Sequence, residues 1–78
     1  MEIHHLVKMA NQIGKFFETS TDPDKAVEGI ARHLKSFWDP RMRREIIAHV
    51  KKSGRGLDEP VKKALLMLAA EDEERTSA

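Results

Sequence analysis

The dipeptide Asp39-Pro40 sets the main constraint on how this chain can fold. Aspartate followed by proline is typical of a helix start, because the carboxylate caps free backbone N–H groups and the fixed φ of proline suits the first helical position. The same pair occurs at Asp22-Pro23, and Asp58 lies two residues before Pro60. These starts divide 78 residues into stretches that each suit a helix of a few turns. The sequence therefore predicts short helices joined by tight turns.

Apolar residues within each stretch recur at the three- and four-residue spacing of an amphipathic helix. No stretch has the alternation expected of a strand, and Ser53-Gly54-Arg55-Gly56 ends the third stretch with glycines that are free to adopt positive φ. The predicted fold class is all-α. We expect a single domain over residues 1–70, a small bundle of four short helices at about 2–18, 23–38, 40–52 and 59–70, followed by a frayed acidic tail at 71–78.

One stripe of each helix is expected to face the core. Gly14 lies on the first stripe, where its missing side chain would let another helix approach closely. Met9 and Phe16 lie beside that stripe, where they either widen the core-facing surface or dock on something else. The expected core residues are Ile3, Leu6, Val7, Ala10, Ile13, Phe17, Val27, Ile30, Ala31, Leu34, Phe37, Trp38, Met42, Ile46, His49, Val50, Val61, Ala64, Leu65, Leu68 and Ala69.

The composition argues against several classes of function. Without cysteine the chain has no disulfide, thiolate zinc site or iron–sulfur cluster of its own. His4, His5, His33 and His49 lack the spacing of a metal site, and no motif of a catalytic nucleophile or a phosphate-binding loop is present. We therefore predict no catalytic residue, no cofactor and no metal. No apolar run approaches the ~20 residues that span a bilayer, and the N-terminus does not read as a signal peptide, so the expected location is cytoplasmic.

Positive charge is concentrated in the middle of the chain. Six basic residues oppose two acidic ones between residues 39 and 56, whereas three oppose six from residue 57 onward. Arg41, Arg43 and Arg44 crowd the first turn of the third helix, where each exposed cation costs about 0.3–1 kcal/mol against the helix dipole. Either the acidic residues 71–74 fold back onto these arginines, or the arginines are solvated, or they meet carboxylates of a partner protein, which the planar guanidinium binds well.

Other residues accompany the arginines as candidate partner contacts. Trp38 is expected mainly as a core anchor, but tryptophan and arginine are also enriched at interface hot spots. Gly29 and His33 are predicted on the outer face of the second helix, where a glycine costs about 1 kcal/mol relative to alanine unless a partner backbone approaches it. The predicted partner-binding residues are Gly29, His33, Trp38, Arg41, Arg43, Arg44 and Ile47.

Three segments of the chain carry a resemblance to a known family. They are Met9-Ala10-Asn11-Gln12-Ile13-Gly14-x-Phe16-Phe17, Gly29-Ile30-Ala31-x-His33-Leu34 and Phe37-Trp38-x-Pro40-Arg41-Met42-Arg43, where x is a position outside the match, with weaker support from Leu57-x-x-Pro60-Val61-x-x-Ala64-Leu65. The chain resembles the delta subunits of cytoplasmic NAD-dependent formate dehydrogenases. The segment around Phe37-Trp38 is the distinctive one, and the similarity extends from about Ile3 to Leu68.

The resemblance implies a non-catalytic, cofactor-free small subunit of a bacterial enzyme complex. In such a complex the catalytic (alpha) subunit oxidises formate at a molybdenum or tungsten pterin site, and other subunits carry electrons to NAD. The implied role is assembly, stability or cofactor maturation by docking on the catalytic subunit. Two alternatives stay open: a transient chaperone for pterin cofactor insertion, and a small helix-turn-helix-like nucleic-acid-binding protein, which the balanced total charge disfavours. Homo-oligomers of the isolated chain are also possible.

Overall fold

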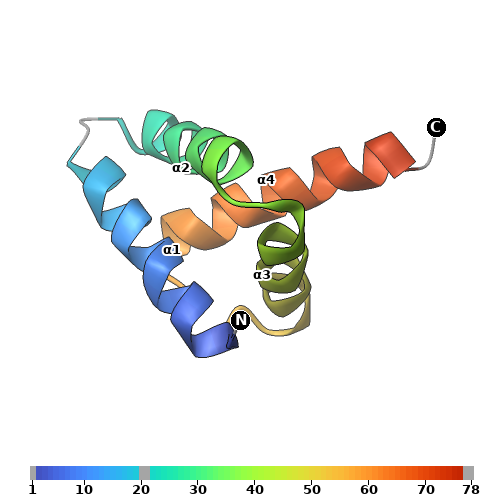
Figure 1. The fold of residues 1–78 in the computed structure, drawn as a ribbon. Coiled ribbons are helices and arrows are strands. Elements are labelled where there is room, and N and C mark those ends of the chain that lie inside the picture. The colour runs from blue at the N-terminus through green and yellow to red at the C-terminus, as the bar shows by residue number, and fades with distance from the viewer. Residues whose placement is uncertain (1, 20–21, 77–78) are drawn as a thin grey trace.

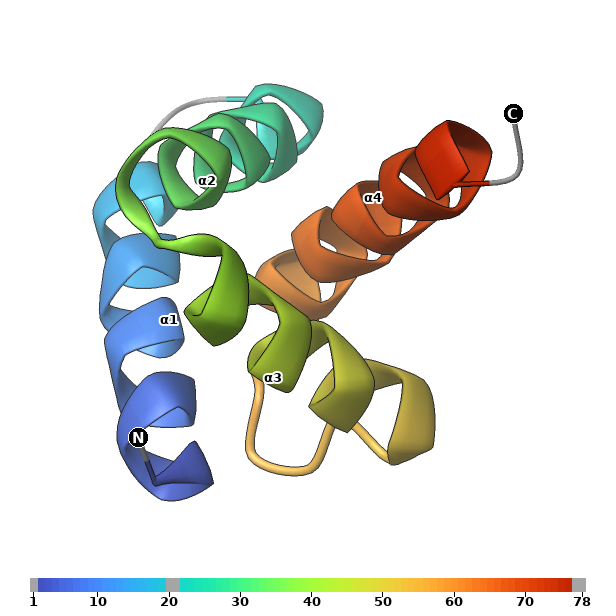
Figure 2. The ribbon, with the colours of Figure 1, turned by 45° about the vertical axis from the view of Figure 1, so that its right-hand side comes forward.

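Four α-helices follow one another along the chain. A computed structural model describes residues 2–19 and 22–76, with side chains described as far as residue 72. The helices are α1 (Ile3–Glu18), α2 (Pro23–Phe37), α3 (Pro40–Lys52) and α4 (Glu59–Thr76). Figures 1 and 2 show α1, α2 and α3 arranged around α4, whose last turns project beyond the other helices. The described part of the chain contains no strand, so the predicted all-α fold is confirmed.

Two of the helix starts form as the sequence predicts. The Asp22 side chain accepts a hydrogen bond from the backbone N–H of Asp24 at 3.0 Å, and the Asp39 side chain accepts one from Met42 at 2.9 Å. In both cases a proline follows as the first helical residue. Each carboxylate thus satisfies an N–H group that the helix itself leaves unpaired.

The connection from α3 to α4 depends on two glycines in the left-handed region. Gly54 has a φ of 66° and Gly56 a φ of 86°, so both of the predicted glycines adopt positive values. The Gly54 N–H donates to the His49 carbonyl at 2.9 Å, which ends α3, and His49 Nε2 lies 2.9 Å from the Arg55 carbonyl oxygen. Because L side chains adopt such φ values rarely, this turn requires glycine.

The core lies where α1, α2 and α3 meet α4. Gly14 lets α1 approach α4, because a Cβ atom there would lie only 2.5 Å from a methyl carbon of Val61. The predicted role of Gly14 is therefore confirmed, and so is the burial of Trp38. The largest fully buried side chains are Leu6, Ile30, Leu34, Ile46, Val61 and Leu65.

The structure corrects two assignments of burial. Phe37 was expected in the core but is 75% exposed, because α2 ends there and the core position is taken by the next residue, Trp38. Ile47 was expected on an outer flank beside Arg43 but is only 6% exposed. It is buried because α3 packs against both α1 and α4, so the buried face of α3 is wider than one stripe.

The helix boundaries also differ at three ends. α1 begins at Ile3, α2 ends at Phe37, and α4 continues to Thr76 instead of ending near residue 70. The acidic residues of the predicted tail therefore extend α4 as far as Thr76, while residues 77 and 78 lie outside the described part.

Within the described part of the chain, no helix combines the length and the apolar character needed to cross a bilayer.

Candidate functional site

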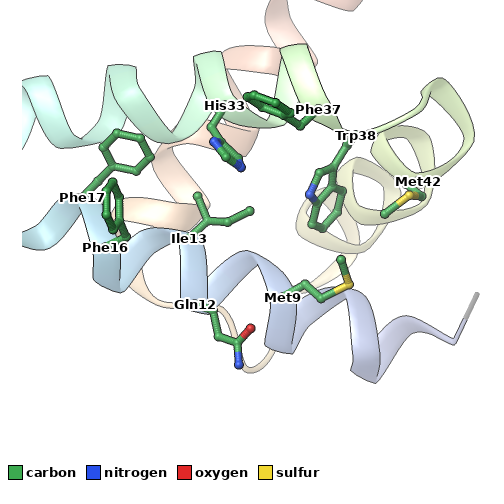
Figure 3. A pocket seen from close by; sticks show the side chains of 9 residues that line it. All are labelled: Met9, Gln12, Ile13, Phe16, Phe17, His33, Phe37, Trp38 and Met42. Atoms are coloured by element: carbon green, nitrogen blue, oxygen red, sulfur yellow. The ribbon is translucent and has the colours of Figure 1, made fainter.

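An apolar groove lies between α1, α2 and the start of α3 (Figure 3). Its volume is about 570 Å³, which falls within the range of ligand and peptide sites. Gln12 and His33 contribute the polar groups of its wall, and every other lining residue is aliphatic, aromatic or methionine. The groove is lined by Met9, Gln12, Ile13, Phe16, Phe17, His33, Phe37, Trp38 and Met42.

An aromatic row, formed by Phe16, Phe17, His33 and Phe37, follows one wall of the groove. Phe16 and Phe17 pack edge to face with ring centroids 5.2 Å apart, and Phe17 meets His33 at 6.2 Å. His33 in turn lies 4.6 Å from Phe37, with their ring planes inclined by 30°. Contacts of this kind hold large apolar side chains in one arrangement, so the wall is preformed although Phe16 and Phe37 are 73% and 75% exposed.

Trp38 connects this groove to the core. It follows the last residue of α2 and has an extended backbone with φ −86° and ψ 138°. Its N–H still donates to the Leu34 carbonyl at 3.0 Å. The indole is 6% exposed, and Figure 3 shows it in the groove between Phe37 and Met42. Trp38 therefore serves as a core anchor and as part of the groove surface.

Gly29 has a structural role within the chain that the sequence did not reveal. A Cβ atom at this position would lie 2.6 Å from two carbons of the Phe17 ring. The sequence placed Gly29 on the outer face of α2, whereas in the structure the Phe17 side chain packs against this position. The missing side chain instead lets the Phe17 ring pack closely against α2, between Phe16 and His33 in the aromatic row.

The three arginines at the start of α3 have little to offset their charge. Arg44 Nε donates to the Pro40 carbonyl at 3.4 Å, and Arg43 Nε is buried without a hydrogen-bond partner. Within the described side chains, none of the three forms an ion pair. Glu71 does not fold back onto them but lies 3.5 Å from Lys35 Nζ, while the side chains of residues 73 and 74 lie outside the described part.

The structure brings some of the predicted contact residues together and separates others. His33 and Trp38 line the groove, and the arginines lie at the α3 start, next to the groove residue Met42. Ile47 is in the core and away from solvent. Sequence reasoning missed Phe37, Gln12 and Met42 as surface residues of one groove. Met9 and Phe16 are seven residues apart and therefore lie on the same flank of α1. This spacing was the feature of the sequence that indicated the groove.

The carboxylates and histidines of the described residues do not form a candidate metal site. Among residues 2–19 and 22–72, whose side chains are described, no group of three or more His, Asp or Glu could hold a metal ion.

The fold and the groove define a small all-helical protein with an apolar, aromatic-walled groove on its surface. The chain matches the family model described as NADH-dependent formate dehydrogenase delta subunit FdsD over residues 5–65, and it belongs to that family. All nine groove residues fall within the matched region. Neither the curated proteins nor the solved structures compared with the chain gave a match.

Proposed function

We propose that this protein is a non-catalytic subunit that docks on the catalytic subunit of a cytoplasmic NAD-dependent formate dehydrogenase. Docking supports the assembly, stability or cofactor maturation of the enzyme. The groove and the neighbouring arginines of α3 are the docking surface in this proposal. The chain itself contributes no catalytic group and no cofactor.

The groove is the observation that carries this proposal. Phe16 and Phe37 leave most of their surface in water, and burying such a side chain is worth about 1.5–3 kcal/mol. An exposed apolar patch with a preformed wall is typical of a protein–protein contact. The lining residues belong to the same segments that give the chain its family resemblance, which supports a role shared with delta subunits.

The chemistry of the groove favours a protein partner over a pterin cofactor. A pyranopterin phosphate is anionic and needs cations or several N–H donors around it. The lining includes no lysine or arginine, and its polar groups come from Gln12 and His33. Apolar side chains of a partner protein fit this surface better.

Co-expression tests the proposal. A tagged form of the chain is produced together with the formate dehydrogenase subunits, and the complex is separated by size exclusion. We expect this protein and the catalytic subunit to co-elute in equal amounts, and we expect the isolated chain to show no formate oxidation with NAD. If the chain is captured in less than equal amounts, and only during cofactor loading, the result would indicate a transient chaperone and not a stable subunit. Elution of the catalytic subunit without this protein at any stage would contradict both roles.

A further inference from the structure

We infer that the groove receives a short amphipathic helix of the partner, with apolar side chains in the groove and aspartate or glutamate residues at the end that meets the start of α3. This inference rests on the proposed docking function. It goes further by assigning the chemistry of the segment that docks.

The dimensions of the groove suit a helix. Met9 and Phe16 lie on the same side of α1, seven residues apart, which corresponds to about 10 Å along the helix axis. A second helix laid alongside covers the same length with its residues i, i+3 or i+4, and i+7, the usual anchors of a helix bound in a groove. Strand addition needs an exposed sheet edge, and the described part of the chain has no strand.

The lining of the groove favours apolar side chains of the partner helix. Phe16 and Phe37 form the exposed rim, Ile13 is partly buried, and the buried Trp38 lies between Phe37 and Met42 (Figure 3). Met9 and Met42 lie toward the other end, where flexible thioether side chains adapt to the shape of a bound residue. Leucine, isoleucine, methionine or phenylalanine of a partner would replace water at each of these surfaces.

The positive charge at the start of α3 favours carboxylates of the partner. Arg41 and Arg43 flank Met42 in the sequence, at the positive end of the α3 dipole. Asp39, the acid that caps α3, already accepts a hydrogen bond from the Met42 N–H, and none of the three arginines forms an ion pair within the described side chains. A carboxylate of the partner would pair with the exposed guanidinium of Arg41 and offset the helix dipole, and arginine binds a carboxylate through two parallel hydrogen bonds.

The chain's own C-terminus does not fit these requirements. The residues from 73 to 78 read Glu-Glu-Arg-Thr-Ser-Ala and include no large apolar side chain. They could offer carboxylates to the arginines, but they could not fill an aromatic groove. Residues 73–78 are therefore not the occupant, and in the proposed function the occupant is a segment of the catalytic subunit.

Site-specific photo-crosslinking in the intact complex identifies the segment. Benzoylphenylalanine is placed at position 16 or 37, and the crosslinked peptide is sequenced by mass spectrometry. The control carries it in place of Leu66, an apolar residue of α4 that is 50% exposed but does not line the groove. We expect positions 16 and 37 to label one short stretch with apolar residues at helical spacing and at least two Asp or Glu residues within a turn of it. Position 66 should not label that stretch.

Several results would overturn the inference while leaving the docking function intact. These are a stoichiometric complex without crosslinks from positions 16 and 37, a crosslink to a second copy of this chain, and a labelled stretch without carboxylates. A complex that does not form with the wild-type chain would instead contradict the proposed function itself.

The salt dependence of binding gives a second readout. Arg41→Gln with Arg43→Gln should weaken association with the catalytic subunit more than about tenfold at low salt and should reduce its sensitivity to ionic strength. Arg44→Gln is the matched control, because Arg44 Nε is engaged with its own helix at Pro40, and its effect should be smaller. Equal affinity and equal salt dependence of the double variant and the wild type would rule out carboxylates at this end of the groove.

Discussion

At the scale of single residues, Asn11 holds together parts of the chain that are far apart in sequence. Its side-chain NH₂ donates to the Gly56 carbonyl at 2.8 Å, and its side-chain oxygen accepts from the Asp58 N–H at 3.0 Å. Both bonds attach the α3–α4 turn to α1. One amide side chain therefore fixes where α4 begins relative to α1.

Asn11→Ala should lower the free energy of unfolding by about 1–3 kcal/mol, because it leaves a partly buried N–H without its partner. The measurement is urea unfolding followed by circular dichroism. Asn11→Asp keeps the acceptor for the Asp58 N–H but places a carboxylate oxygen against the Gly56 carbonyl oxygen, so it should also lower the free energy of unfolding. An unchanged unfolding midpoint for Asn11→Ala would show that the turn does not depend on this residue.

Gly14 and Gly29 offer a matched pair of substitutions. Gly14→Ala should destabilise the protein by about 1–3 kcal/mol through overpacking, although alanine is the better helix former. The new methyl group would meet Val61, a fully buried side chain with little room to move. Gly29→Ala should cost less, because the Phe17 ring that it meets is only partly buried and can shift. Stabilisation by Gly14→Ala in the same urea experiment would contradict the close packing of α1 on α4.

Sequence reasoning identified one of these glycines and not the other. Gly14 lies on an apolar stripe, so a close helix contact could be expected there. Gly29 and Asn11 act through contacts with residues in other helices or turns, which helical spacing does not encode. The partner of Gly29 is Phe17 on α1, and nothing in the α2 segment points to it.

At the scale of helices, the start of α3 combines a cap with an unfavourable charge distribution. Asp39 caps the helix beside a first turn that holds arginines and no acidic residue. Asp22 caps α2, whose first turn contains an acidic residue instead. Both caps use an aspartate followed by proline, but Asp22 accepts from the N–H two residues on and Asp39 from the N–H three residues on, and their electrostatic surroundings differ.

Asp39→Ala should cost about 1 kcal/mol or more of unfolding free energy, and it should cost more than Asp22→Ala. Added salt should reduce the difference, because it screens the repulsion between the arginines and the helix dipole. Urea unfolding of both variants at low and high salt provides the measurement. Equal losses at low salt would mean that the arginines do not strain the start of α3.

Helix starts were predictable because they depend on local chemistry. Asp39-Pro40 marked the first residue of α3 and Asp22-Pro23 that of α2, and the structure agrees. The burial of Ile47 was not predictable in this way, because it depends on both α1 and α4 packing against α3.

At the scale of the whole molecule, the groove exists only because α1, α2 and α3 meet around α4. The groove residues lie in the segments that resemble the delta subunit family. The sequence did not show, however, that Met9, His33 and Met42 lie on one surface. Phe37 is the clearest case: it continues an apolar stripe in the sequence and forms the groove rim in the structure. A domain of this size also buries a limited core, so docking on a larger subunit would add to its stability.

The most direct test of this account is to remove the groove rim and measure docking. Phe16→Ser with Phe37→Ser should weaken association with the catalytic subunit by more than about tenfold, since large side chains near the centre of an interface dominate binding. Helix content should not change, because both rings are exposed in the isolated chain. Leu66→Ser, on α4 outside the groove, is the control and should bind as the wild type does. If the double variant co-elutes with the catalytic subunit as tightly as the control, the groove is not the docking surface.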